Sequence, residues 1–316
     1  MARPVIIDCD PGQDDAVALL LAFAARDELD ILGVTTVAGN VPLDLTQRNA
    51  RRMVDLAGRS DVPVFAGCAR PMVCDLVTAE HVHGESGLDG IELWEPRQPL
   101  ASQHAVDFIV ETLLARDDAS VTLVPTGPLT NIAMALVKEP RIAPRIREIV
   151  IMGGAMREGG NHTPSAEFNI RVDPHAAHVV LRCGRPITMF GLDVTHQVPA
   201  TKARLAPIRA LANPVAEAVV GMLEFYGRFD SGKYGADGAP LHDPCTIAYL
   251  LAPGIFETRH CNVAVETDSA LTRGHTAVDF WHVTERPKNV HWAHRVDADA
   301  FYRLLTERLG RYSGRI

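Results

Sequence analysis

The stretch Asp8-Cys9-Asp10-Pro11-Gly12-Gln13-Asp14-Asp15 places four carboxylates within eight residues. The apolar run Val5–Ile7 before it has the composition of a buried strand, and Ala16–Arg26 after it has the pattern of a helix that is apolar on most faces. In open α/β folds, ligands bind at the carboxyl ends of the strands. These acids therefore predict an α/β fold with a ligand site directly after its first strand.

The rest of the chain supports this fold class, because short β-branched runs alternate with helical patterns along the first 200 residues. We expect a Rossmann-like, mostly parallel but mixed sheet flanked by helices. Further strands are predicted at Ile31–Val37, Val62–Phe65, Val121–Val124, Glu148–Ile151, Pro186–Met189, Asn262–Glu266 and Ala277–Val283. Helices are predicted at Leu43–Ala57, Ser102–Arg116, Leu129–Lys138, Pro174–Arg182, Pro214–Arg228 and Asp297–Leu309. No repeat or linker marks a boundary, so residues 1–316 are predicted to form a single domain.

Composition and charge narrow the class of protein. The chain has 316 residues, of which 47% are hydrophobic and 22% are charged, as in ordinary globular proteins. Its formal net charge is −8 and it has no basic cluster, so we expect no polymeric nucleic acid as a partner. The longest apolar run, Ala16–Ala25, is too short to span a membrane, and the six cysteines form no CxxC pair. We therefore expect a cytoplasmic protein with reduced thiols and no membrane contact.

The four acids of Asp8–Asp15 indicate a cation site. Like charges this close raise one another's pKa unless a cation neutralises them, and oxygen ligands suit Ca²⁺ or Mg²⁺ better than zinc. An alternative for Asp14 and Asp15 is that they offset the dipole of the following helix. An EF-hand is excluded because Leu19 stands where its last ligand would be, and a P-loop is excluded because the stretch has no lysine.

Residues Asp8–Ala18 match the pattern DxDPGxDDAxA throughout, and the chain thereby resembles the inosine–uridine-preferring nucleoside hydrolase family. Further segments look like that family's landmarks and follow in its order: Thr35–Asn40, His83–Glu85, Pro125–Asn131, Met152–Gly154, Ala166–Asn169 and His242–Pro244. The resemblance implies an α/β enzyme that hydrolyses the N-glycosidic bond of ribonucleosides, binds one Ca²⁺ and forms a homodimer or homotetramer.

The resemblance also assigns a metal site. It implies that Ca²⁺ is bound by the carboxylates of Asp10, Asp15 and Asp243 and by the main-chain carbonyl of Thr126. Read alone, Thr126 is typical of a turn, and Asp243 of the N-cap of a helix that begins at Pro244. In the mechanism implied, a water bound to the metal attacks C1′ through an oxocarbenium-like transition state, and Asp10 takes its proton as the base.

The substrate residues implied by the resemblance surround this metal. Asp14, Asn40 and Asn169 would contact the 2′- and 3′-hydroxyls of the ribose, and Asn161 and Glu167 the 5′-hydroxyl. Met152, Phe168 and His83 would complete the pocket. Without the family, Asn161 reads as part of a polar surface loop and Phe168 as a core residue.

Two points stay open at this stage. A general acid should protonate the departing base; His242 is the first candidate and His83 the second. The glycine-rich segment Phe225–Pro240 suggests a mobile loop over the nucleobase, so purine or pyrimidine preference is not determined, although Leu241–Ala248 leans toward the pyrimidine-preferring bacterial members. The histidines and tryptophans of Trp281–His294 alternate as in strands at a sheet edge.

Two other functions fit part of the sequence. Val5–Asp10 also fits the start of haloacid-dehalogenase-type Mg²⁺ phosphatases, in which Asp8 would be the nucleophile, but Gly12 and the Asp14-Asp15 pair depart from that pattern. A non-catalytic nucleoside-binding protein would keep the site without turnover. Release of ribose from a nucleoside would distinguish the predicted hydrolase from both.

Overall fold

The computed structural model describes residues 2–234 and 237–312, and only the backbone of 229–234. One sheet of ten strands forms its centre, in the order β4-β3-β2-β1-β5-β6-β7-β10-β8-β9. Strands β1 to β7 are parallel to one another, and β10 runs parallel to β7. The pairs β10–β8 and β8–β9 are antiparallel. This mostly parallel, mixed sheet confirms the predicted fold class.

The strands are β1 (Arg3–Cys9), β2 (Leu29–Thr36), β3 (Val64–Ala66), β4 (Leu100–Ala101), β5 (Val121–Pro125), β6 (Ile146–Met152), β7 (Ile187–Phe190), β8 (Phe256–Val265), β9 (Thr276–Asp279) and β10 (Val290–Val296). The α-helices are α1 (Gln13–Phe23), α2 (Leu43–Leu56), α3 (Glu80–His83), α4 (Ala105–Leu114), α5 (Thr130–Lys138), α6 (Phe168–Val172), α7 (Pro174–Val180), α8 (Leu192–Thr195), α9 (Lys202–Arg209), α10 (Pro214–Tyr234), α11 (Pro244–Leu251) and α12 (Ala298–Leu309).

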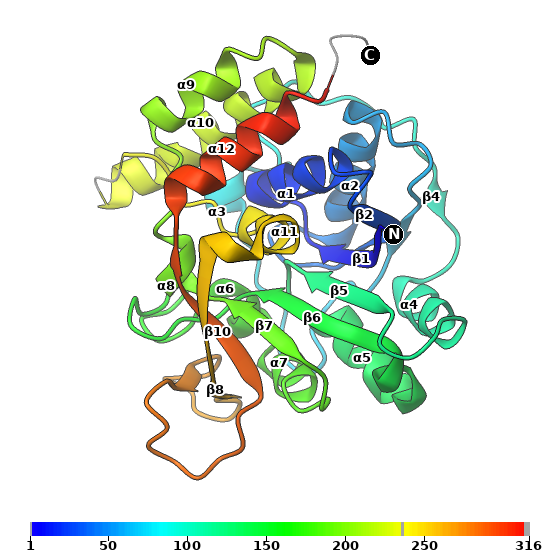
Figure 1. The fold of residues 1–316 in the computed structure, drawn as a ribbon, viewed down its shortest axis with the longest axis vertical. Helices are drawn as coiled ribbons and strands as arrows, with labels where there is room; N and C mark the ends of the chain where they lie inside the picture. Colours follow the sequence, from blue (N-terminus) through cyan, green and yellow to red (C-terminus); the bar gives the residue numbers. More distant parts are fainter. Residues whose placement is uncertain (1, 235–236, 313–316) are drawn as a thin grey trace.

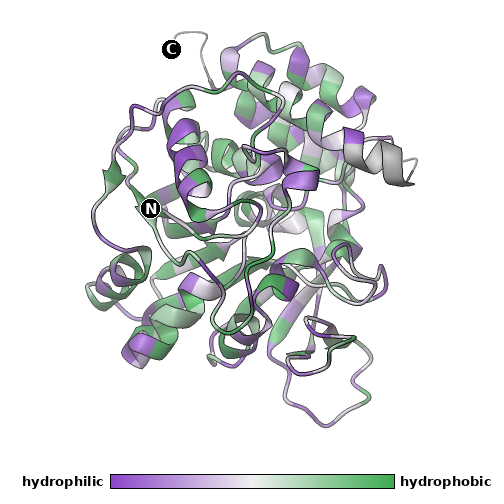
Figure 2. Ribbon diagram, turned by 180° about the vertical axis from the view of Figure 1, so that it is seen from behind, coloured by the Kyte–Doolittle hydropathy of each residue, from purple (hydrophilic) through white to green (hydrophobic). Residues whose placement is uncertain are grey.

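Helices cover both faces of the sheet and create a separate hydrophobic core on each. Figure 1 shows α1, α10, α11 and α12 on one side of the strands and α4, α5 and α7 on the other. Side chains along β1 point alternately to the two faces of the sheet and pack into both cores. Val5 and Ile7 face the α1 side, and Ile6 faces the α4–α5 side. Figure 2 shows the same arrangement as green central strands and purple patches on the outer helices. Among the described residues, no helix has the length and apolar character needed to cross a bilayer.

Helix α1 is buried along its whole length, which explains its apolar sequence. All eleven of its residues are buried, including Gln13, Asp14 and Asp15 in its first turn. The backbone N–H of Gly12, just before the helix, donates to the carboxylate of Asp15 in the first turn. This hydrogen bond satisfies a backbone donor at the start of the helix. The three polar residues are thereby buried at the end of the helix that lies next to the end of β1.

The strand order reverses direction at β1. The chain moves from β1 outward to β2, β3 and β4, and then returns to the other side of β1 with β5, β6 and β7. The gap between the carboxyl ends of β1 and β5 is therefore a topological switch point, where no connection covers the sheet and ligands bind in open α/β folds. Asp10 follows β1 and Thr126 follows β5, so the acidic loop lies at this point.

The C-terminal strands differ from the prediction. Strand β10, which was not expected as a separate strand, lies inside the sheet between β7 and β8. Strand β9 ends at Asp279, because the backbone turns there and His282 adopts a φ of 56°. The predicted edge position is wrong for His291, Trp292 and His294, which lie in the inner strand β10, where Trp292 is completely buried. Trp281 and His282 directly follow β9, which is an edge strand of the sheet.

The predicted loop Phe225–Pro240 is also corrected in part. Helix α10 continues to Tyr234, and residues 235–236 lie outside the described residues. Gly227 suggested a loop, but it lies within the helix, where a Cβ would make only ordinary van der Waals contact with the backbone of Ala239, at 3.5 Å from its nitrogen.

Candidate active site

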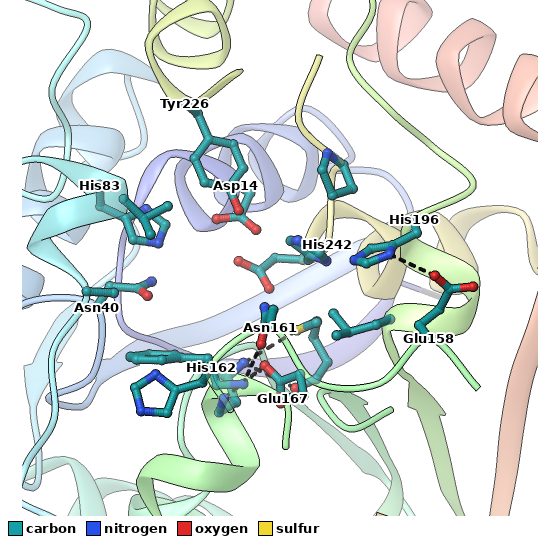
Figure 3. A pocket seen from close by; sticks show the side chains of 18 of the residues that line it. Asp14, Asn40, His83, Glu158, Asn161, His162, Glu167, His196, Tyr226 and His242 are labelled. Carbon is teal, nitrogen blue, oxygen red and sulfur yellow. Dashed lines mark hydrogen bonds and ion pairs between the residues drawn. The ribbon is translucent and has the colours of Figure 1, made fainter. Parts of the chain in front are cut away.

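One cavity of about 620 Å³ lies above the switch point and contains nearly every residue that the sequence predicted for the site. The predicted residues that line it are Asp14, Asn40, His83, Thr126, Met152, Asn161, Glu167, Phe168, Asn169, His242 and Asp243. Asp10 and Asp15 do not line the cavity and are buried beneath it, with 1% and 0% exposure. Figure 3 shows the labelled side chains pointing into this cavity from several separate segments of the chain.

The carboxylate of Asp10 is held between two glycines. A Cβ on Gly39 would lie 2.0 Å from its Oδ2, and a Cβ on Gly127 would lie 2.4 Å from its Oδ1. Oδ2 accepts a hydrogen bond of 2.7 Å from the backbone N–H of Asn40, whereas Oδ1 is buried and has no partner. A buried carboxylate oxygen without a partner is costly, so this atom marks a place for a ligand.

Asp15 connects the loops after β1, β2 and β5. Its Oδ1 accepts from the Thr126 hydroxyl at 2.8 Å, and its Oδ2 accepts from the backbone N–H of Gly12 and from Nδ2 of Asn40. Asn40 Nδ2 also donates to the carbonyl of Asp10. These bonds hold the acidic loop rigidly against its neighbours.

A cluster of carboxylates forms where the acidic loop meets the start of α11. Asp14, Asp15 and Asp243 each offer an oxygen, and these oxygens lie within 4.8 Å of one another. Burial, followed by the charge of Asp15, raises the pKa of Asp14 to about 7. Burial and the charges of Asp14, Asp15 and Asp10 raise the pKa of Asp243 well above its usual value. The cluster is therefore strained in its ionised form, and a divalent cation bound there would relieve that strain.

This cluster differs by one member from the predicted ligand set. The sequence assigned Asp10, Asp15 and Asp243 to the metal and Asp14 to the sugar, whereas the compact carboxylate group contains Asp14 instead of Asp10. Asp10 is turned toward the backbone of Asn40 by the hydrogen bond to its Oδ2. Its Oδ1 has no donor among the described residues, so this oxygen stays free to accept from a ligand.

Two polar side chains complete the floor of the cavity. Asn169 donates from Nδ2 to the carbonyl of Thr126 at 2.6 Å and to that of Met152 at 3.3 Å. Glu167 accepts from the backbone N–H groups of Gly154, Asn169 and Ile170. Burial raises the pKa of Glu167 to about 7 despite these hydrogen bonds.

Asn161 and Phe168 are joined at the rim of the cavity. The Oδ1 atom of Asn161 accepts from the backbone N–H of Phe168 at 2.9 Å, and the Phe168 ring meets the His162 ring edge-on. Asn161 is exposed, as a surface loop residue would be, and it nevertheless lines the cavity. The two readings of this residue are therefore compatible.

Two buried histidines reach the cavity from opposite sides (Figure 3). The Nδ1 atom of His83 lies 2.7 Å from the side-chain oxygen of Gln13, and the ring stacks on Tyr226. The Nδ1 atom of His242 lies 2.8 Å from the hydroxyl of Thr195. Burial lowers the pKa of His83 to about 3 and lowers the pKa of His242 well below its usual value. Both rings are therefore neutral near pH 7.

Several residues of the cavity wall were not predicted from the sequence. His196 lies beside His242 with ring centroids 5.7 Å apart, and its Nδ1 is 3.3 Å from Glu158. Tyr226 and His162 also line the cavity. His196 follows β7 by six residues, so its position after the carboxyl end of a parallel strand is a signal that could have identified it.

Comparison with known proteins agrees with this geometry. The family model for inosine-uridine preferring nucleoside hydrolase matches residues 5–303. The chain belongs to this family. The resemblance predicted from its motifs is confirmed, and the protein is a nucleoside hydrolase, a glycosidase that acts on N-glycosyl compounds.

Relatives match along almost the whole chain. An uncharacterized protein of Schizosaccharomyces pombe is 51% identical over 97% of this chain and 99% of its own. A pyrimidine-specific ribonucleoside hydrolase, RihA, of Shewanella sp. strain ANA-3 is 48% identical over 99% of this chain and 98% of its own. Among solved structures, a plant nucleoside hydrolase superimposes with a TM-score of 0.91 at 31% identity over 98% and 99%. A purine-preferring ribonucleoside hydrolase from Gardnerella vaginalis superimposes with a TM-score of 0.90 at 32% sequence identity, and the match covers 98% of each chain.

Family membership overturns the phosphatase alternative. In that alternative Asp8 is the nucleophile, but its side chain is completely buried and does not line the cavity. Its Oδ1 accepts from the Thr35 hydroxyl and from Nδ2 of Asn131, which connects β1 to β2 and α5. Asp8 therefore supports the strands from below and cannot reach a substrate.

The carboxylate cluster predicts a stabilising response to divalent cations. We expect Ca²⁺ at 100 times its dissociation constant to raise the free energy of unfolding by about 2.7 kcal/mol, measured by thermal unfolding after thorough chelation. Asp243→Asn should remove this response and should stabilise the metal-free protein, because it removes one of the mutually repelling buried charges. Asp30→Asn, on an exposed acid of β2, should respond to Ca²⁺ like the unmodified protein. An unchanged response in Asp243→Asn would contradict the site.

Proposed function

We propose that this protein is a Ca²⁺-dependent ribonucleoside hydrolase with a preference for pyrimidine nucleosides. The observation that carries the proposal is the floor of the cavity, where buried carboxylates of Asp14, Asp15 and Asp243 lie within 4.8 Å of one another and the buried Asp10 keeps one oxygen without a partner. All-oxygen donors that are closely spaced and buried suit a hard cation, and Ca²⁺ tolerates the irregular geometry of ligands from separate loops.

The chain's own residues would divide the reaction between them. Ca²⁺, held by Asp10, Asp15, Asp243 and the carbonyl of Thr126, would orient and acidify the attacking water. Asp10 would take the proton of that water on Oδ1, the atom without a protein donor. The glycines on both sides of Asp10 would hold its carboxylate in place during the transfer. Electrons of the broken C1′–N bond leave with the base, which must then gain a proton.

The ribose would bind through acceptors that lie beside the cation site. The side-chain nitrogens of Asn40 and Asn169 donate to protein carbonyls, which leaves their amide oxygens to accept from hydroxyl groups. Asp14 adds a carboxylate at the same side of the cavity. When a substrate lacks the 2′- or 3′-hydroxyl, the protein acceptors that would bind it are left without a hydrogen-bond donor. Glu167 and Asn161 are proposed for the 5′-hydroxyl, and Met152 and Phe168 for apolar contact.

The pyrimidine preference rests on sequence similarity. The 48% identical RihA of Shewanella is described as pyrimidine-specific, whereas the purine-preferring enzyme of Gardnerella vaginalis is 32% identical. Both proteins share the fold, so the preference must come from side chains on the base side of the cavity. The wall there contains His83, His196 and His242.

A panel of ribonucleosides analysed by chromatography tests the proposal. We expect free base and ribose from uridine and cytidine at higher kcat/KM than from inosine, with loss of activity on chelation and recovery with Ca²⁺. Asp10→Asn should lose nearly all turnover, because it removes a ligand and the base together. 2′-Deoxyuridine should be cleaved about 10⁴-fold less efficiently than uridine. Tight uridine binding without any release of base would instead favour a non-catalytic binding protein.

His242 is proposed as the acid that protonates the departing base. It lines the cavity next to the ligand Asp243, and its hydrogen bond with Thr195 fixes the ring. Burial, together with the nearby His196 and His83, lowers its pKa, so the imidazolium is a strong acid but a minor species at neutral pH. For the general-acid role, His242 must therefore bind a proton from solvent before the base departs, and only the small fraction of protein that holds the imidazolium carries out this step.

His242→Ala should lower kcat on uridine about 10²- to 10⁴-fold and change KM little. p-Nitrophenyl riboside has a leaving group that needs no proton, so the variant should cleave it almost as fast as the unmodified enzyme. The comparison separates acid catalysis from support of Asp243, because a displaced cation would slow both substrates. Equal losses on the two substrates would overturn the acid role.

We also propose that the protein forms a homo-oligomer in the cytoplasm. The loops between β8, β9 and β10, orange in Figure 1, project from the body and carry the exposed apolar side chains Leu271, Trp281 and Val283. Large apolar side chains that are this exposed on projecting loops favour an association surface. Sedimentation should give a mass at least twice the protomer's 34.3 kDa, and Trp281→Lys should reduce it. A monomer at micromolar concentration would contradict the proposal.

A further inference from the structure

Gln13 makes a complete set of buried hydrogen bonds at the edge of the cavity. Its side chain is entirely buried, and Nε2 donates to the carbonyls of His83 and Asp89 at 2.8 and 3.1 Å. Its Oε1 lies 2.7 Å from Nδ1 of His83. Because carbonyl oxygens can only accept, the amide orientation is determined: the nitrogen faces the two carbonyls and the oxygen faces the ring.

This orientation determines which nitrogen of His83 carries the hydrogen. An amide oxygen has no hydrogen to give, so Nδ1 must be the donor in the bond to Gln13. A neutral imidazole has one hydrogen on nitrogen, and the other nitrogen, Nε2, then has a free electron pair. The low pKa that burial gives His83 agrees with a neutral ring.

Contacts with neighbouring residues also fix the position of the His83 ring. Its Nδ1–Cε1 edge lies against the backbone of Gly12, where a Cβ would be only 2.4 Å from Nδ1. Tyr226 stacks on the ring with centroids 5.3 Å apart and planes 19° from parallel. Figure 3 shows the ring facing the cavity beside Asp14 and Asn40.

We propose that Gln13 is a positioning residue that holds His83 as the Nδ1–H tautomer, so that Nε2 of His83 accepts a hydrogen from the bound nucleoside. The proposal rests on the proposed function in one respect only, that a nucleoside occupies this cavity. In this tautomer, His83 recognises a hydrogen-bond donor on the substrate through Nε2. It therefore cannot supply a proton from Nε2 to the departing base.

The hydrogen that His83 accepts must come from an N–H or O–H group of the substrate. A pyrimidine nucleoside offers an N–H group on the base, such as N3–H of uracil, whereas the ribose hydroxyls are assigned above to other residues. A neutral hydrogen bond in a buried site is worth about 5- to 100-fold in binding when its loss leaves the acceptor unpaired. A substrate without the matching donor should lose kcat/KM by that factor.

The tautomer can be measured without any turnover. In protein labelled with ¹⁵N-histidine, we expect the signals of His83, assigned by their loss in His83→Phe, to show a protonated Nδ1 and an unprotonated Nε2. Gln13→Met keeps the length of the side chain and removes both its oxygen and its nitrogen, so the Nε2–H form should appear. Gln47→Met, the same substitution at a half-buried glutamine of α2 that donates to the carbonyl of Asp44, should leave the spectrum unchanged.

Kinetics with substrate analogues identify the donor. 3-Methyluridine lacks the base N–H, and 3′-deoxyuridine and 5′-deoxyuridine each lack one hydroxyl. The penalty for 3-methyluridine should nearly vanish in His83→Phe and shrink in Gln13→Met. The penalties for these two deoxyuridines and for 2′-deoxyuridine, whose missing hydroxyls are assigned to other residues, should stay the same in both variants.

Each result has a definite consequence. An Nε2–H ring or an imidazolium in the unmodified protein would overturn the proposal, as would a pure Nδ1–H ring that persists in Gln13→Met. Penalties that all survive in His83→Phe would overturn the acceptor role. Absence of nucleoside hydrolysis in the unmodified protein would refute the proposed function and leave the tautomer measurement intact, so the two failures are distinguishable.

Discussion

Repulsion among buried carboxylates is the constraint on which the site depends. Asp14, Asp15 and Asp243 place oxygens within 4.8 Å of one another, and burial raises the pKa of each. Such a cluster is unfavourable without a positive charge, so the protein keeps it only because the surrounding structure over-determines its position. Hydrogen bonds from Thr126, Asn40 and Gly12 to Asp15 supply that rigidity.

The sheet explains how this unfavourable cluster is assembled. The acidic loop follows β1, Asn40 comes after β2 and Thr126 comes after β5, and these three strands are neighbours with parallel directions. The fully buried α1 anchors the loop from the other side, because its apolar residues pack against the core. Hydrophobic burial far from the chemistry therefore supplies the free energy that holds the carboxylates together.

Two histidines of the cavity wall are neutral because of their hydrogen-bond partners. His83 and His242 have no carboxylate in their hydrogen bonds: one is bonded to the Gln13 amide and the other to the Thr195 hydroxyl. Without a carboxylate to stabilise the imidazolium, burial dominates and both pKa values fall. The cavity thus has an acidic floor and a wall with two neutral histidines.

The fold class and the central strands could be predicted from local signals, because β-branched runs and an apolar helix are contiguous in the chain. Eleven of the residues that line the cavity were predicted as well, but through the resemblance of contiguous motifs such as Asp8–Ala18 to a known family. Only the tertiary structure decided that β10 is an inner strand, that α10 extends to Tyr234, that Asp14 joins the carboxylate cluster, and that Gln13 faces His83. Each of these depends on contacts between segments distant in sequence, and such contacts leave no periodic pattern for sequence analysis to detect.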